Sequence, residues 1–296
     1  MKKKRGMRPI PYDYEAAFKT SVDMLGEYFL EQIAKQNRKG LYACKEIYSG
    51  AQLELEIFPE FFKNEDIPEG GKIKKSKKVQ DNLNDKNARK YLERLINANF
   101  GSKDIWATLV YRKEPKNMEE AKRLMKNYID RLNYHRKKKG LKKLRYIYVT
   151  EYDPSAKIRY HHHIIMDGDM DRDMVEKLWG HGDRNQVRRL ECDKDGLSGM
   201  ANYVTKAPKG KKRWSCSTGL KKPVEKKHYN KRTSPGRYKK VGSFVQKMVK
   251  DQQSIEQMVK VWHPGYEYRR SEVYFNDFNG MFYIYVRMCK SEVRLE

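Results

Sequence analysis

The residues best suited to chemistry are three consecutive histidines, His161, His162 and His163, followed by the apolar run Ile164–Met166. Such a run predicts a buried strand, and strand side chains alternate between two faces. We therefore expect His161 and His163 on one face and His162 on the other. Two imidazoles on one face can bind one divalent ion, so the motif predicts a metal site, although a lone buried histidine is usually structural.

A carboxylate precedes this histidine pair. Glu151 ends a strand expected at about residues 144–151, and the histidine strand is expected at about 159–167. A short connection between two such strands would bring Glu151 back beside His161. Two histidines and one carboxylate leave coordination positions open for phosphate oxygens. The alternative is an exposed glutamate at a strand end.

A tyrosine and a lysine further along the chain could act on a phosphate. Tyr203 and Lys206 lie in a segment with helical spacing that follows Gly196 and ends at Pro208. One helical turn separates them, so the ammonium would stand beside the phenol oxygen. Because an ordinary tyrosine has a pKa of about 10, a nearby cation and a metal-polarised phosphate would help the phenolate attack. The chain has 21 tyrosines, and a packing tyrosine beside a solvated lysine is the alternative.

The charge balance favours a nucleic-acid partner. Lys and Arg number 65 against 39 Asp and Glu, which gives a formal net charge of +26. An excess of this size attracts a polyanion over a long range. A solvated basic surface, or the general basicity of a ribosome-associated protein, fits the charge equally well, so the chemistry must come from specific residues.

Cysteine spacing and hydropathy limit the other classes. Four widely spread cysteines, Cys44, Cys192, Cys216 and Cys289, form neither a zinc-ligand spacing nor a disulfide framework, which predicts the reducing cytoplasm. No apolar run approaches the roughly 20 residues that span a bilayer, so we expect no membrane partner. The basic start of the chain lacks the apolar stretch of a secretory signal and is expected to be a flexible arm.

Periodicity predicts the elements that position these residues. Helices are expected at about residues 12–37, 85–100, 118–139 and 174–179, and strands at about 41–44, 53–58, 105–111, 144–151, 159–167 and 185–192. Residues 66–78 are rich in Pro, Gly and Lys and predict a linker. The strand-helix-strand-strand-helix-strand-helix order from residue 105 onward indicates an α+β sheet domain rather than a doubly wound α/β fold.

A basic segment follows Pro208, and a helix at about 243–261 and a β-hairpin of 272–275 and 281–288 come after it. We divide the chain into an N-terminal accessory region and linker (1–80), a catalytic domain (81–225), and a C-terminal basic segment, helix and hairpin (226–296). The basic segment is a candidate DNA contact, although a solvated loop is an equal alternative. Its candidate residues are Lys209, Lys211, Lys212, Arg213, Lys221 and Lys222.

The order of these motifs resembles that of the HUH endonucleases, specifically the rolling-circle replication initiators of small plasmids and phages. Trp106–Tyr111 looks like the family's first motif, Glu151–Met166 like its metal motif and Ala201–Lys206 like its nucleophile motif. The resemblance covers about residues 103–220 and is closest to the single-tyrosine branch. It departs from the family at His162, where an apolar residue is common, so a register in which His162 binds the metal stays open.

The resemblance implies the roles of the site residues. His161 and His163, with Glu151 as third ligand, would hold Mg²⁺ or Mn²⁺, and Arg159 precedes the pair at the family's usual offset and is expected to contact DNA. Tyr203 would be the nucleophile and Lys206 its helper. The implied fold is a five-stranded antiparallel sheet of the RNA-recognition or ferredoxin-like type, flanked by helices.

The implied function is to nick and join single-stranded DNA, or an origin hairpin, at a rolling-circle origin through a 5′-phosphotyrosine. The chain contains no G-x-x-x-x-G-K-[ST] phosphate loop, so a host helicase and polymerase are expected as partners. A mobilisation relaxase or a single-tyrosine transposase would use the same residues. The alternative outside this class is a non-catalytic basic DNA- or RNA-binding protein.

Overall fold

The computed structural model of the chain describes residues 20–21, 42–61, 77–192, 196–197, 199, 214–229, 241–276 and 279–291. The chain divides into two compact units, one of Ala88–Lys222 and one of Met1–Asn87 with Pro223–Glu296. The first unit carries the histidine motif. The helix expected at 12–37 and the segment that carries Tyr203 lie outside the described residues.

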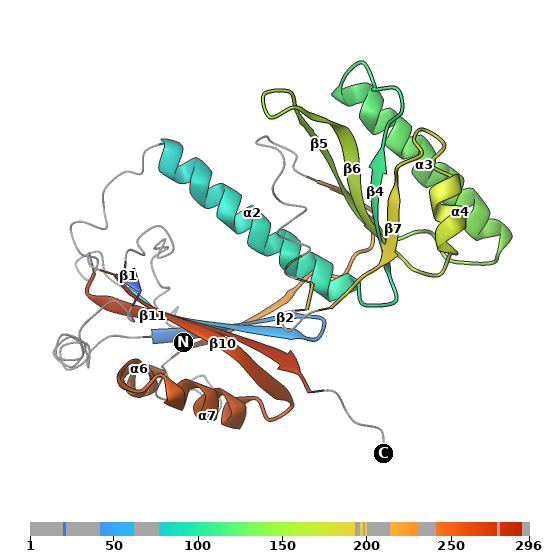
Figure 1. Cartoon of the computed structure of the whole chain (residues 1–296). Coiled ribbons are helices and arrows are strands. Elements are labelled where there is room, and N and C mark those ends of the chain that lie inside the picture. The colour runs from blue at the N-terminus through green and yellow to red at the C-terminus, as the bar shows by residue number, and fades with distance from the viewer. Residues whose placement is uncertain are drawn as a thin grey trace, which may run out of the picture. The chain divides into compact units, whose positions relative to one another are not determined.

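The unit of Ala88–Lys222 contains an antiparallel sheet of five strands in the order β7-β4-β6-β5-β8, shown in green and yellow in Figure 1. Helix α3 connects β4 to β5, and helix α4 connects β6 to β7. This is the β-α-β-β-α-β connectivity of ferredoxin-like folds, with one strand added beside β5. The prediction of an α+β fold with a five-stranded antiparallel sheet is confirmed. The bounds are β4 Ile105–Val110, α3 Met118–Lys138, β5 Tyr146–Asp153, β6 Ile158–Met166, α4 Arg172–Lys177, β7 Gln186–Arg189 and β8 Ser215–Cys216.

Local signals explain where α3 begins and ends. The side chain of Asn117 accepts a hydrogen bond from the backbone N–H of Glu120 at 2.9 Å and so caps the first turn. The first turn is acidic and the last turn is basic, as the helix dipole favours. Gly140 follows with a φ of 68°, a conformation that glycine adopts without strain.

Helices cover both faces of this sheet. Helices α3 and α4 pack on one face, where Met125, Tyr128 and Trp179 are buried against strand residues such as Leu109 and Ile164. On the opposite face, the end of helix α2 (Lys77–Asn99) buries Leu92, Leu95 and Ile96 against Trp106 and Ile165. Because successive strand residues alternate between these two cores, the direction of each side chain in β6 is fixed by packing.

The second unit contains a six-stranded antiparallel sheet in the order β1-β10-β11-β3-β2-β9. Helices α6 and α7 pack on one face of it through residues such as Val245, Met248 and Trp262. The sheet joins strands from both ends of the chain, since β3 pairs with β11. The bounds are β1 Thr20–Ser21, β2 Tyr42–Ser49, β3 Gln52–Pro59, β9 Val224–Tyr229, α6 Val241–Lys250, α7 Gln253–Trp262, β10 Tyr266–Asn276 and β11 Met281–Lys290.

Two details differ from the expected elements. The single helix expected at 243–261 is two helices, because Asp251 interrupts it and its side chain accepts hydrogen bonds from the N–H groups of Gln253 and Ser254. Part of the basic segment is strand β9, in which Lys227 lies 2.6 Å from Glu60. Opposite charges on neighbouring strands therefore order a stretch that its composition alone describes as a loop.

Candidate metal centre

The register of three neighbouring strands brings the predicted ligands together. In the antiparallel pair of β5 and β6, Glu151 lies directly opposite His161. In the pair of β4 and β6, Thr108 lies opposite His163. The sequence predicted Glu151 beside His161, and the structure places it there.

Three side-chain atoms converge at this point. His161 Nε2 lies 3.1 Å from Glu151 Oε2 and 3.1 Å from His163 Nε2, and His163 Nε2 lies 3.4 Å from Glu151 Oε2. Ligand bonds of about 2.0–2.1 Å at right angles or slightly wider would separate the ligand atoms by roughly 3 Å. Among the described residues, these three form the one group of acidic, histidine or cysteine side chains with metal-binding geometry.

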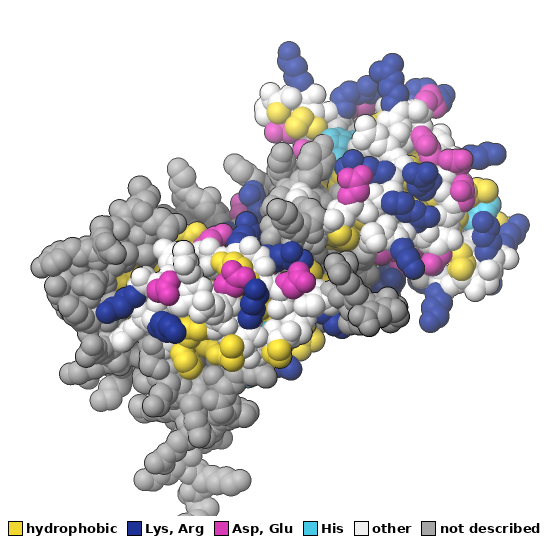
Figure 2. All heavy atoms as spheres, turned by 60° about the horizontal axis from the view of Figure 1, so that its bottom comes forward, with side chains coloured by type: hydrophobic (Ala, Val, Ile, Leu, Met, Phe, Trp, Pro, Cys, Tyr) yellow, Lys and Arg dark blue, Asp and Glu magenta, His cyan; other side chains and the backbone are white. Residues whose placement is uncertain are grey.

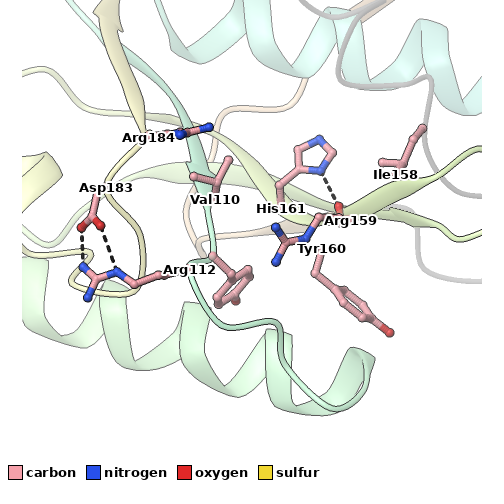
Figure 3. Close-up of a pocket in the computed structure, with 9 residues that line it drawn as sticks. Val110, Arg112, Ile158, Arg159, Tyr160, His161, Asp183 and Arg184 are labelled. Carbon is pink, nitrogen blue, oxygen red and sulfur yellow. Dashed lines mark hydrogen bonds and ion pairs between the residues drawn. The ribbon is translucent and has the colours of Figure 1, made fainter.

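The hydrogen bond of His161 settles which of its nitrogens is free. His161 Nδ1 lies 2.8 Å from the backbone carbonyl oxygen of Arg159, and this contact is drawn in Figure 3. A carbonyl oxygen only accepts, so Nδ1 carries the hydrogen and Nε2 of the neutral ring presents a lone pair. That lone pair faces a carboxylate oxygen of Glu151, and two acceptors this close need a cation between them. The donor set therefore fits a divalent metal ion.

His163 is held from two sides in a neutral form. Its Nδ1 lies 3.2 Å from Thr108 Oγ1, and its ring stacks on that of Trp106 with centroids 5.1 Å apart. Burial, with a smaller contribution from the neighbouring His161, lowers the pKa of His163 to about 3. A neutral imidazole in a fixed orientation is the form that binds a metal. Thr108 was not singled out from the sequence, although strand register would have pointed to it.

His162 lies on the opposite face of β6. Its side chain is fully buried, with Nε2 2.7 Å from the Tyr111 hydroxyl and Nδ1 2.9 Å from the Thr150 hydroxyl. Burial lowers the pKa of His162 to about 3. Both ring nitrogens thus have partners within the helix-covered core, and the register in which His162 would join the other two is not the one observed.

A pocket of about 570 Å³ lies beside His161, at the ends of β4 and β6. Figure 3 shows three arginines around it. Arg112 forms a two-pronged ion pair with Asp183, with Nε 2.9 Å from Oδ2, and Arg159 lies 3.4 Å from Glu114. Arg184 forms no ion pair with a described residue. Arg159, the predicted DNA contact, therefore lies in the wall of the pocket next to the histidine pair.

Gly182 explains why the loop with Asp183 and Arg184 approaches the pocket so closely. A β-carbon at this position would collide with the carbonyl oxygen of Val110 at the end of β4. The backbone N–H of Arg112 also donates to the carbonyl oxygen of His181 at 2.8 Å. Because the glycine lets the loop rest on the end of β4, the two charged side chains reach the pocket.

Most of the other predicted site residues lie outside the described part of the chain: Tyr203, Lys206, Lys209, Lys211, Lys212 and Arg213. Two described residues flank that segment, and α2 holds both of them. The side chain of Asn97 accepts a hydrogen bond from the N–H of Leu197 at 3.0 Å. Asn99 accepts from the N–H of Lys221 and donates to its carbonyl oxygen, each at 2.8 Å.

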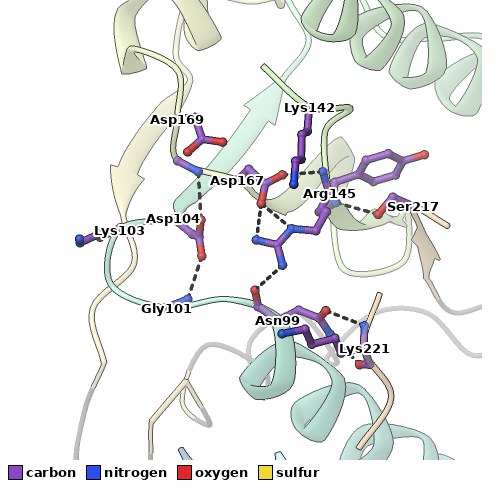
Figure 4. Close-up of polar contacts among 12 residues, drawn as sticks. Asn99, Gly101, Lys103, Asp104, Lys142, Arg145, Asp167, Asp169, Ser217 and Lys221 are labelled. Carbon is purple, nitrogen blue, oxygen red and sulfur yellow. Dashed lines mark hydrogen bonds and ion pairs between the residues drawn. The ribbon is translucent and has the colours of Figure 1, made fainter. Parts of the chain in front are cut away.

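Figure 4 shows how this second contact is supported. Arg145 donates to the backbone carbonyl oxygen of Asn99 at 3.2 Å and forms a 2.7 Å ion pair with the buried Asp167. Lys221 is therefore fixed through its backbone, and its exposed side chain, like that of Lys222, is available to a ligand. Nothing in the sequence pattern singled out Asn97 or Asn99.

The visible surface of this unit is rich in basic side chains. In Figure 2, Lys and Arg side chains spread over its described surface at the upper right, with fewer Asp and Glu side chains between them. Of the helices in the described part of the chain, none is long and apolar enough to cross a membrane.

Residues 104–208 match the family model of the replication-associated proteins of the ORF2 type. The match covers roughly a third of the 296-residue chain and contains strands β4 to β7 with Glu151, His161 and His163. No curated protein and no solved structure matches the chain.

Proposed function

We propose that the protein initiates DNA replication of the rolling-circle type by nicking and joining single-stranded DNA at an origin. One observation carries the proposal: Glu151, His161 and His163 converge within 3.4 Å inside the stretch that is similar to replication-associated proteins. The formal net charge of +26 supports a nucleic-acid substrate. A non-catalytic DNA-binding protein has no need of such a ligand set.

The three converging side chains would hold Mg²⁺ or Mn²⁺, a choice of metal that oxygen and imidazole ligands allow. A divalent ion supplies positive charge for the oxygens of the scissile phosphate and leaves coordination positions open for them. Thr108 and the carbonyl oxygen of Arg159 orient the two imidazoles through their Nδ1 atoms.

Tyr203 provides the nucleophile. Its phenol oxygen attacks the scissile phosphorus, a phosphotyrosyl bond to the 5′ side forms, and the bond between phosphorus and the 3′-oxygen breaks. The 3′-oxygen takes up a proton and becomes a hydroxyl that can prime synthesis. Lys206 stabilises the phenolate, and attack by another 3′-hydroxyl reverses the step and joins strands.

The basic residues and partners complete the proposal. Arg159 and the lysines and arginine of 209–222 contact the DNA backbone, because cationic side chains on a strand displace its counterions. A host helicase opens the duplex and a host polymerase extends the 3′-hydroxyl. These partners follow from the reaction and from the absence of a phosphate-loop motif in the sequence.

A covalent-adduct assay tests the proposal. The protein is incubated with labelled single-stranded oligonucleotides from its replicon and Mn²⁺, and the denatured products are separated by size. We expect an adduct with the wild type and none with Tyr203→Phe. The matched control is Tyr134→Phe, because Tyr134 is a 58% exposed tyrosine on α3 outside the predicted nucleophile motif. Its adduct yield should equal that of the wild type.

Two results would count against the mechanism. If the Tyr203→Phe variant still forms the adduct, the nucleophile is wrong. If the wild type forms no adduct on any origin sequence while binding those strands and Mn²⁺, the protein does not act as a nicking enzyme.

A further inference from the structure

A second groove lies on the helix-covered side of the five-stranded sheet, between α3 and the strands β5 and β8. Its volume is about 780 Å³. Tyr146 and Tyr148 of β5 line it, and they belong to the same buried cluster as Met125 and Ile129 of α3. Glu151, His161 and His163 project from the opposite face, so this groove is separate from the candidate metal centre.

Three lysines at the rim of the groove have no acidic partner among the described residues. Lys122 and Lys126 lie one helical turn apart on α3, and Lys143 precedes β5. All three are exposed, and none forms an ion pair with a described residue. By contrast, Arg123 and Arg145 at the same rim are paired with Glu120 and Asp167 at 3.2 and 2.7 Å. The rim therefore keeps three positive charges available to a ligand.

The wall opposite these lysines offers hydroxyl groups and aromatic rings. Ser215 lies opposite Tyr148 in the pairing of β5 with β8, so the two side chains share a face. Ser217 accepts a hydrogen bond from the N–H of Tyr146 at 3.1 Å, and Thr218 lies next to it along the chain. The rings of Tyr146 and Tyr148 are stacked with centroids 6.1 Å apart. Lysines, hydroxyls and aromatic rings along one groove are the groups that bind a single nucleic-acid strand.

We propose that this groove, lined by Lys122, Lys126, Lys143, Tyr146, Ser215 and Thr218, binds the sugar-phosphate backbone of single-stranded DNA away from the cleaved phosphate. A volume of about 780 Å³ admits a short stretch of one strand and excludes a duplex, which is roughly 20 Å wide. The choice of DNA as the occupant rests on the proposed function. The strand would then be held on both faces of one sheet.

Photocrosslinking locates the strand directly. An oligothymidylate that carries 4-thiothymidine is irradiated with the Tyr203→Phe protein, which cannot form the proposed phosphotyrosyl bond, and crosslinked residues are mapped by mass spectrometry. We expect crosslinks to Tyr146 or to residues 215–218. If crosslinks form elsewhere in the chain and none forms at these positions, the groove does not bind DNA.

Charge removal measures the energetic part. In the triple variant Lys122→Gln, Lys126→Gln, Lys143→Gln, the slope of log affinity against log salt for oligothymidylate should fall by about 2, since each single-strand phosphate contact contributes about 0.7. The matched control removes the same charge at exposed lysines that do not line the groove, in Lys137→Gln, Lys139→Gln, Lys177→Gln. An equal fall in the control would overturn the proposal, because the effect would then be one of net charge.

Two further readouts separate the alternatives. If the groove variant binds oligothymidylate normally but loses binding of polyglutamate, the occupant is an acidic protein segment and the proposal is wrong. Adduct formation on an oligonucleotide that spans only the cleavage site should be unchanged in the groove variant. Loss of groove binding with intact adduct formation would contradict only this inference, whereas an adduct that no longer depends on Tyr203 would contradict only the proposed function.

Discussion

The two faces of strand β6 use the same residue type for different purposes. On one face, His161 and His163 point at Glu151 and converge on a common centre. On the other face, His162 is fully buried, and hydroxyl groups of Tyr111 and Thr150 contact both of its ring nitrogens. A histidine becomes a candidate ligand when one ring nitrogen is held and the other is left facing acceptors, and it becomes a structural residue when both are held.

The largest expected effect comes from removing a ligand on the open face. We expect His161→Ala or His163→Ala to lower metal affinity and adduct yield by more than about 100-fold, since even outer contacts of metal ligands are worth 10–100-fold. Isothermal titration with Mn²⁺ measures the affinity. Folding, followed by circular dichroism, should be retained. Unchanged Mn²⁺ affinity in both variants would contradict the metal assignment.

The next effect concerns the closed face. His162→Ala should reduce the free energy of unfolding by about 2–4 kcal/mol, because it leaves a cavity and removes the partner of two buried hydroxyls. Urea denaturation measures this loss. The folded fraction should still bind Mn²⁺ with wild-type affinity. If the variant is as stable as the wild type but no longer binds the metal, the two faces have been assigned the wrong way round.

Added metal should stabilise the folded protein through the open face only. At a free Mn²⁺ concentration of 100 times the dissociation constant, the gain is about 2.7 kcal/mol. Thermal unfolding with and without Mn²⁺ measures it as a rise in midpoint. The rise should persist in His162→Ala and vanish in His161→Ala, and a rise of equal size in His161→Ala would place the ion elsewhere.

The smallest effect tests how the open face is oriented. Thr108→Val removes the hydroxyl beside His163 Nδ1 at nearly constant volume. We expect a loss of about tenfold in Mn²⁺ affinity, because the imidazole is no longer held in one orientation. Thr150→Val, which removes a hydroxyl from the His162 side, is the matched variant and should lower stability without changing Mn²⁺ affinity.

Strand alternation explains how much of this could be predicted from the sequence. The sheet residues of 105–166 show a clear period, so the opposite directions of His162 and His163 followed from the sequence. The role of Thr108 did not, because it depends on the pairing of β4 with β6, which no local pattern specifies. Asn97 and Asn99 were missed for the same reason, since they contact residues 100 and 122 positions away.

The second unit shows a different limit. Apolar periodicity runs through Asp251 in the sequence, and only the side-chain cap on Ser254 reveals that the helix ends there. Lys227 belongs to a strand because Glu60, far away in the chain, lies opposite it. Composition describes such a segment as basic and gives no information about its partner.

The position of β6 within the sheet has a consequence for motion. β6 is the middle strand of the order β7-β4-β6-β5-β8, with β4 and β5 paired along its two sides. Edge strands open most readily, whereas a middle strand separates only when two hydrogen-bonded ladders break together. The spacing of the two imidazoles should therefore persist through the fluctuations that loosen β7 and β8, and backbone amides of His161 and His163 should be among the slowest in the sheet to exchange with deuterium.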